Sequence, residues 1–376
     1  MVTANQQAAP TQSFTHDLWM ESTGIPIHTG YFIEDLRTVD LGWWKERDCN
    51  SCFVQLEGMK GISEVRVTEI PPGGTLPPLK LAFDEMVYVL QGTGITNIWR
   101  SDGKKRSFEW APRSLFILPR HYTHQYSNTR GDTPVRLMHY NRLPPAMSVV
   151  NSPGFFFNNP YEDPQEPEGE LYAEARAVRF GQDDDDDPFL WFGNFFPDLA
   201  AWDKLAPYQH RGAGGHSIHF RIPNTEMRGH MSVFQSRLYK KAHRHGPGTA
   251  IVIPAGEGYS VMWPEGQEKV IVPWHEGSFF VPPGRWFHQH FNAGTSHARY
   301  LALNPIVQVR PEMSETVENR ARDQIEYPDE ETWIRKKFEE ELAKRGTTSL
   351  MPDQAYQDRD YRWKPAAVYQ EVTPVG

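Results

Sequence analysis

The feature that most constrains the fold of this chain is an internal repeat. Residues 85–128 align with residues 249–292 without a gap, at the same offset of 164 residues that separates His124 from His288. A match of this length indicates a duplicated supersecondary unit of about domain size. The repeated positions are Gly92/Gly256, Gly94/Gly258, Trp99/Trp263, Trp110/Trp274, Ser114/Ser278, Phe116/Phe280, Pro119/Pro283, His124-Gln125/His288-Gln289 and Asn128/Asn292.

Both copies are expected to be built from short strands. Segments rich in β-branched and aromatic residues alternate with turns, and the chain holds 31 Pro and 29 Gly. This pattern predicts an all-β fold. The expected strands are Glu64–Glu69, Met86–Leu90, Gly94–Trp99, Ser114–Leu118 and Arg136–Tyr140 in the first copy, and Ser217–Ile222 and Met231–Phe234 in the second.

Three histidines of the second copy form a candidate metal site. Alternate residues of a strand point to the same face, so His243 and His245 can aim both imidazoles at one point. His288, on another strand, is the expected third ligand. With 15 histidines in 376 residues a His-x-His pair is weak by itself, and the repeat is what strengthens the prediction.

These residues resemble the cupin superfamily, whose motifs read G-x5-H-x-H-x3,4-E-x6-G and G-x5-P-x-G-x2-H-x3-N. The second motif is met by Gly277, Pro283, His288 and Asn292, with Arg285 at the inner Gly position. The first motif is met by His243, His245 and Gly256, with Thr249 in place of the usual metal-binding Glu.

The first copy departs further from the motif. Glu85 and His124 are present, but Leu79 and Leu81 replace the two leading histidines, so His124 is read as structural. The resemblance implies a bicupin, with two double-stranded β-helix (jelly-roll) barrels, a few peripheral helices and metal in the second barrel alone. The expected domains are an arm (1–54), a barrel with a degenerate site (55–145), a connection (146–224), a metal-binding barrel (225–310) and a helix with a tail (311–376).

Composition narrows the class of protein. The net charge of −9 and the pI near 5.9 argue against a nucleic-acid partner. The N-terminus lacks a signal pattern and no apolar run is long enough to span a bilayer, so a cytoplasmic protein without a membrane partner is expected. Cys49 and Cys52, the only cysteines, are read as incidental packing, since a zinc site would need a second pair.

Segments outside the repeats carry weaker signals. The acidic run Asp183–Asp187 lacks the alternation of a calcium loop and is read as a solvated loop. Phe189–Phe196 and a short helix at Asp198–Leu205 are expected to cover a sheet, form an oligomer contact or close over the second barrel. Glu330–Lys344 has helical spacing, with Trp333, Phe338 and Leu342 on one face.

The resemblance also suggests a chemistry. Cupins with three His and no ligand Glu include gentisate, salicylate and 1-hydroxy-2-naphthoate dioxygenases. They imply a non-haem Fe(II) dioxygenase that inserts both atoms of O2 into a small anionic, aromatic hydroxylated acid, with ring cleavage. Those enzymes hold iron in the N-terminal cupin, whereas this chain has its histidines in the second. The alternatives are a manganese, nickel or zinc decarboxylase, isomerase or hydrolase, and a non-catalytic binding protein.

Five residues near the ligands are further candidates. His290 lies two residues after His288, so its side chain should point to the same face of a regular strand. It is the candidate acid or base, and the alternative is a barrel histidine held by hydrogen bonds. Arg285 is a candidate for binding a carboxylate, with a surface salt bridge as the other reading. Tyr239, Gln289 and Thr249 are expected to contact substrate, although one bulge before His243 would reverse Tyr239. By resemblance, a homodimer or homotetramer is expected.

Overall fold

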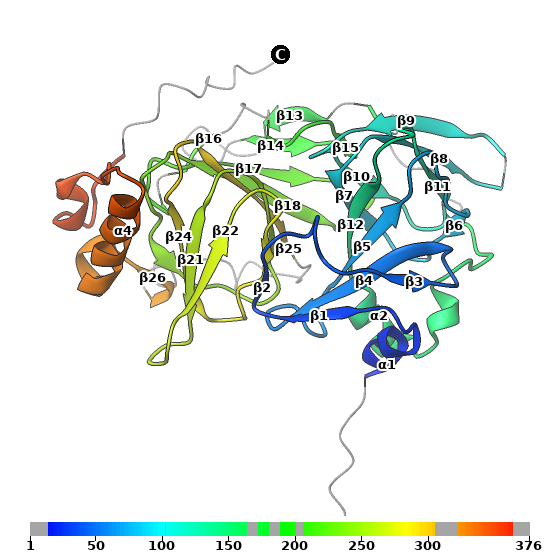
Figure 1. Cartoon of the computed structure of the whole chain (residues 1–376), viewed down its shortest axis with the longest axis horizontal. Coiled ribbons are helices and arrows are strands. Elements are labelled where there is room, and N and C mark those ends of the chain that lie inside the picture. Colours follow the sequence, from blue (N-terminus) through cyan, green and yellow to red (C-terminus); the bar gives the residue numbers. More distant parts are fainter. Residues whose placement is uncertain are drawn as a thin grey trace, which may run out of the picture.

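The computed structural model describes residues 14–101, 103–163, 172–173, 175–179, 189–200, 206–208, 210–304 and 322–363. Over these residues the chain forms two β-barrels side by side, with helices only at their periphery (Figure 1). The fold class predicted from the sequence, all-β with two double-stranded β-helix barrels, is confirmed.

The first barrel consists of an eight-stranded sheet facing a four-stranded one. The larger sheet has the order β1-β4-β5-β12-β7-β10-β15, with β3 beside β4, and the smaller has the order β6-β11-β8-β9. The bounds of the larger sheet are β1 (Ile27–Gly30), β3 (Gly42–Trp44), β4 (Cys49–Leu56), β5 (Glu64–Ile70), β12 (Val135–Asn141), β7 (Glu85–Gln91), β10 (Leu115–Leu118) and β15 (Phe195–Phe196). Those of the smaller sheet are β6 (Leu79–Lys80), β11 (Thr123–Asn128), β8 (Gly94–Trp99) and β9 (Arg106–Trp110).

The second barrel repeats this plan with a nine-stranded and a five-stranded sheet. The larger sheet has the order β13-β14-β17-β18-β25-β20-β23-β2, with β16 beside β17, and the smaller has the order β22-β21-β24-β19-β26. The bounds of the larger sheet are β13 (Arg176–Arg179), β14 (Phe189–Phe192), β16 (Ala206–Pro207), β17 (His216–Arg221), β18 (Arg228–Phe234), β25 (Ala298–Asn304), β20 (Ala250–Ala255), β23 (Phe279–Phe280) and β2 (Phe32–Ile33). Those of the smaller sheet are β22 (Val270–Trp274), β21 (Gly258–Trp263), β24 (Phe287–Asn292), β19 (Ala242–His243) and β26 (Gln324–Ile325).

The strand pairings preserve the sequence repeat. Leu79 pairs with His124 in the first barrel, and His243 pairs with His288 in the second. Gly94 and Gly258 also occupy matching places, each against a tryptophan ring. A Cβ at Gly258 would lie 1.9 Å from the carbonyl oxygen of Phe291, so only glycine fits there.

The two barrels exchange strands at their junction. β2, from the N-terminal arm, pairs with β23 of the second barrel, while β15, from the connection, pairs with β10 of the first. The larger sheets of both barrels contribute to one continuous apolar core, in which Met138 and Leu301 are fully buried. Burial of this shared apolar surface holds the barrels together.

The connection between the barrels is only partly described. The apolar segment 189–196, expected to cover a sheet, form an oligomer contact or close over the second barrel, instead extends the sheets: β14 pairs with β17 and β15 with β10. Residues 198–200 form a turn rather than the start of a helix, and residues 201–205 lie outside the described residues. The acidic run Asp183–Asp187 also lies outside them.

The helices lie on the outside of the barrels. The predicted C-terminal helix is α4 (Thr332–Lys344), which begins two residues later than expected and buries Ile334, Phe338 and Leu342. It packs on the outer face of the five-stranded sheet, where the rings of Phe338 and Tyr239 are 5.0 Å apart. No helix among the described residues is long and apolar enough to cross a membrane. Within the described ranges the other helices are α1 (Thr15–Ser22) and α2 (Leu143–Val149), with short 3-10 turns at Pro153–Phe155, Tyr327–Asp329 and Asp353–Tyr356.

Candidate metal centre

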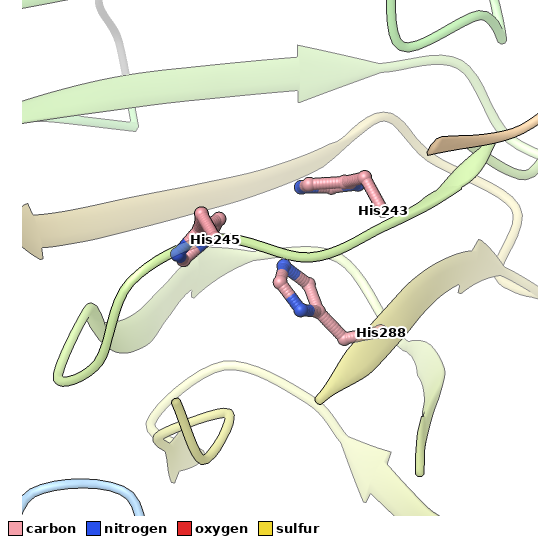
Figure 2. Close-up of side chains that lie close together, drawn as sticks. All are labelled: His243, His245 and His288. Atoms are coloured by element: carbon pink, nitrogen blue, oxygen red, sulfur yellow. The ribbon is translucent and has the colours of Figure 1, made fainter. Parts of the chain in front are cut away.

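Three histidines converge inside the second barrel. His243 ends β19, His245 follows in the loop after it, and His288 lies on β24. Figure 2 shows their side chains pointing toward one another from these two segments. Each offers a ring nitrogen, and these atoms all lie within 4.8 Å of one another. In the described part of the chain this is the only group of three such ligands.

The hydrogen bonds of these rings select the tautomer that a metal needs. In all three, Nδ1 lies next to a backbone carbonyl oxygen, which can only accept. Nδ1 must therefore carry the proton, and Nε2 is the nitrogen whose lone pair could bind an ion. The acceptors are the carbonyl oxygens of Lys241, Gly246 and Trp286, at 3.2, 2.9 and 3.3 Å respectively.

Burial also keeps two of the three histidines neutral. It lowers the pKa of His243 and of His288 well below the ordinary 6.5, and neighbouring cationic groups lower the pKa further. A metal therefore does not have to displace a proton from either ring at neutral pH. These residues fit a three-histidine metal centre.

A β-bulge brings His243 to this place. Tyr239 lies opposite Phe291, and the amide of Lys240 donates to the carbonyl of His290, yet His243 pairs with His288. The four steps from Tyr239 to His243 therefore match the three steps from Phe291 to His288, so one extra residue is inserted before His243. As a result Lys240, rather than Tyr239 or Lys241, shares the inner face with His243.

Because of the bulge, Tyr239 points out of the barrel and not toward the barrel interior as expected from the sequence. Its hydroxyl donates to Glu330 beneath α4, and its ring stacks on Phe291, 4.8 Å away, on the outside of the sheet. Gln289 also faces outward, where its side-chain amide donates to Glu330 over 3.2 Å. Neither side chain lines the cavity that holds the three histidines.

Arg285 also lies away from this cavity. Its guanidinium forms two hydrogen bonds to Asp323, at 2.7 and 3.0 Å, and its side chain is half-exposed. This is the surface salt bridge that the sequence left open as the alternative. Arg285 adopts a φ of 67°, which explains why the corresponding motif position favours glycine.

The histidines open into a cavity of about 400 Å³. Among the described residues its wall carries several cationic or basic side chains and no Asp or Glu. A cavity of this character favours an anionic ligand. The basic residues on the wall are Arg211, Arg228, Lys240, His219, His230 and His290, in addition to the three candidate ligands.

Two predicted residues do line the cavity. Thr249 occupies the place of Glu85 in the repeat and brings no charge to the wall. The ring of His290 lies 5.5 Å from that of His288, and its Nδ1 is hydrogen-bonded to the Ser260 hydroxyl at 2.7 Å. Burial lowers the pKa of His290 to about 3, so the ring is neutral at physiological pH.

In the first barrel a guanidinium takes the place of a metal. Arg66 donates to Glu64 at 2.7 Å and to Glu85 at 2.8 Å, and all three side chains are buried. His139 Nδ1 lies 2.8 Å from Glu85, whose pKa is held far below its usual range despite burial, by the charge of Arg66. His124, buried beside this network, has no second histidine at Leu79 or Leu81. The degenerate site is thus an internal ion-pair network.

The two cysteines lie on β4 and are both buried and free. Burial raises the pKa of Cys52 to about 12, and it also raises that of Cys49. Thiols held protonated in this way are poor nucleophiles and poor metal ligands.

The fold and site together define a two-barrel protein with a three-histidine candidate metal centre in its second barrel. No known family's sequence profile matches the chain, and no curated protein matches it. Among the solved structures that are similar are oxalate decarboxylase and a plant 7S globulin. One is a deletion mutant of oxalate decarboxylase from Bacillus subtilis, with 10% identity and a TM-score of 0.45 over 73% of this chain and 76% of that one.

Two further similar structures are of plant proteins. The 7S globulin of Momordica charantia has 13% identity and a TM-score of 0.46 over 74% of this chain and 84% of its own. Vicilin from Capsicum annuum has the same identity and TM-score, over 74% of this chain and 86% of its own. Similarity at this level says nothing about activity.

Proposed function

We propose that this protein is a non-haem Fe(II)-dependent dioxygenase that inserts both atoms of O2 into a small aromatic, hydroxylated acid. The observation that carries the proposal is the combination of three imidazoles with a cavity whose described wall has basic groups and no carboxylate. Such a site leaves the full charge of a divalent ion uncompensated, and an anionic substrate would compensate it.

Each group of the chain has a defined part in this proposal. His243, His245 and His288 would hold the ion through Nε2, in the tautomer that their carbonyl partners impose. A bound ferrous ion would supply open coordination positions and the redox chemistry that O2 requires. The cavity wall orients the anion, and the neutral ring of His290 is available as a hydrogen-bonding group next to the reacting oxygen atoms.

A specific observation favours one alternative, a metal-dependent decarboxylase or isomerase that uses manganese, nickel or zinc. Lys240, Tyr300 and His290 place protons beside the three histidines, and a lyase needs a proton donor close to its carbanion. If the cavity binds an anion but no substrate is converted, the protein is a non-catalytic binding protein.

Oxygen uptake separates these functions. Protein reconstituted anaerobically with Fe(II) would be mixed with hydroxylated benzoates in an oxygen electrode, with the His243→Ala variant as control. The proposal predicts substrate-dependent uptake of O2 that is lost in the variant. Substrate consumption that proceeds equally without O2 would replace it with the lyase or isomerase. A metal-loaded protein without turnover of the panel would contradict both.

A further inference from the structure

A buried lysine lies in the cavity next to the candidate metal centre. Lys240 is 1% exposed and reaches across the barrel interior to the opposite sheet, where Ser232 on β18 pairs with Tyr300 on β25. Its Nζ lies 2.5 Å from the Ser232 hydroxyl and 2.9 Å from the Tyr300 hydroxyl. The face of Phe234, 5.3 Å away, stabilises the cation in part but provides no counter-charge.

The donors in this group outnumber the acceptors. An ammonium has three N–H donors, and the hydroxyl oxygens of Ser232 and Tyr300 accept two of them. Since the Tyr300 oxygen accepts from Lys240, its own proton remains to be donated, and no acceptor for it is present among the described residues. One N–H and one O–H thus face a cavity whose described wall has no carboxylate.

We propose that Lys240 and Tyr300 bind a carboxylate of the substrate, one donor to each oxygen. That the bound carboxylate belongs to a substrate rests on the proposed function; that this site binds a carboxylate does not. A buried ammonium without a counter-ion is costly, and a ligand carboxylate compensates this cost through charge-assisted hydrogen bonds. Lys240 and Tyr300 therefore determine specificity.

The position of this anion site relative to the metal centre limits the substrate further. The ring of His290 contacts both, since it lies 5.5 Å from the ring of His288 and 5.1 Å from that of Tyr300, while the rings of His288 and Tyr300 are not themselves in contact. A carboxylate bound at Lys240 is therefore separate from the oxygen atoms that would reach the metal. The substrate class is a ring that carries its metal-binding hydroxyls away from its carboxylate, as in 3,4-dihydroxybenzoate, rather than next to it.

The first barrel provides an internal comparison. Leu76 occupies the place of Lys240, since its amide donates to the carbonyl of Tyr126 at 3.0 Å as that of Lys240 donates to His290 at 2.9 Å. The barrel that lacks the histidine triad thus also lacks the lysine. The two features occur together in the second barrel, as parts of one binding site would.

The test compares two ligands that differ in one group. Metal-loaded, anaerobic protein would be titrated by calorimetry with 3,4-dihydroxybenzoate and with the uncharged 3,4-dihydroxybenzamide. Wild type should prefer the acid by about tenfold or more, the usual scale of a charge-assisted hydrogen-bonded pair. Lys240→Met should remove this preference, and Tyr300→Phe should reduce it.

The matched control is Lys241→Met. Lys241 is the neighbouring lysine, but its Nζ pairs with Glu326 outside the cavity, so the acid preference should stay at the wild-type value. An unchanged preference in Lys240→Met overturns the inference. If that variant fails to fold, equal binding of acid and amide to wild type, or an unchanged preference in Tyr300→Phe, overturns it as well.

Metal content and O2 uptake would be measured on the same samples. An acid preference that depends on Lys240, in a protein that takes up no O2 with any ligand of the panel, would support the carboxylate site and refute the dioxygenase. O2 uptake with no dependence on Lys240 would refute the carboxylate site and support the dioxygenase.

Discussion

Glu330 is a buried carboxyl group that connects the C-terminal helix to the strands of the metal centre. It accepts hydrogen bonds from Tyr239, which precedes Lys240, and from Gln289, which lies between His288 and His290. Burial raises its pKa from 4.5 to about 7, although both hydrogen bonds act in the opposite direction. Folding therefore favours the protonated form of this carboxyl group.

The direction of the pH effect follows from this shift. A group with a raised pKa in the folded state contributes stability that is complete below pH 4.5 and is lost as pH rises through 7. A shift from 4.5 to about 7 corresponds to about 3 kcal/mol at most. Glu330→Gln keeps the shape and the acceptor oxygen but cannot ionise. Relative to wild type, it should gain about 2–3 kcal/mol of stability between pH 5 and pH 8.

The measurement is urea denaturation of wild type and Glu330→Gln at several pH values, taken as the difference between the two proteins so that other titrating groups cancel. Glu331→Gln is the control, because the neighbouring Glu331 is exposed and its pKa is lowered by Lys269. This control should not gain stability as pH rises. A difference for Glu330→Gln that does not change with pH would refute the reasoning.

Three further predictions concern the barrels. Arg66→Met should destabilise the protein by about 3–5 kcal/mol in denaturant, because Glu64 and Glu85 would stay buried without their cation. Its control is Arg130→Met, which removes an exposed arginine and should leave stability almost unchanged; equal losses in the two variants would contradict the network. Gly258→Ala should lower the free energy of unfolding by about 1–3 kcal/mol, because the added Cβ would meet the Phe291 carbonyl oxygen. Gly246→Ala, where a Cβ would have open space around it, should be near neutral. A larger loss for Gly246→Ala than for Gly258→Ala would disprove the packing argument. Removing metal with a chelator should lower the melting temperature of wild type but not that of His243→Ala, since only the wild-type protein is expected to bind the ion when folded. An equal drop in both proteins would place the ion elsewhere.

The repeat explains why the sequence located the three histidines. Its ungapped alignment predicts that His243 and His288 occupy equivalent positions to Leu79 and His124, and the strand pairings show this equivalence. Local alternation was sufficient for His290 as well, because β24 is regular over its whole length and places its even-numbered residues inside.

The rule that alternate residues of a strand share a face gave wrong predictions where the backbone is irregular. The bulge before His243 turns Tyr239 outward and Lys240 inward, and no residue in that segment marks it as a bulge. One signal for Lys240 was available in the sequence: at the repeat offset of 164 residues, Lys240 aligns with Leu76, so a charged residue replaces an apolar one. The exchange of β2 and β15 between barrels was also beyond sequence patterns, because the strands that pair are far apart in the chain.

The central claim is that the second barrel alone holds a metal through His243, His245 and His288. Its most direct test is the metal content of purified, Fe(II)-reconstituted protein by plasma mass spectrometry, for wild type, His243→Ala and His124→Ala. We predict about one iron per chain in wild type and in His124→Ala, and almost none in His243→Ala. The reason is that, in the part of the chain that the structure describes, His243, His245 and His288 form the only group of three potential ligands, with ring nitrogens within 4.8 Å of one another. Full occupancy in His243→Ala would contradict the account.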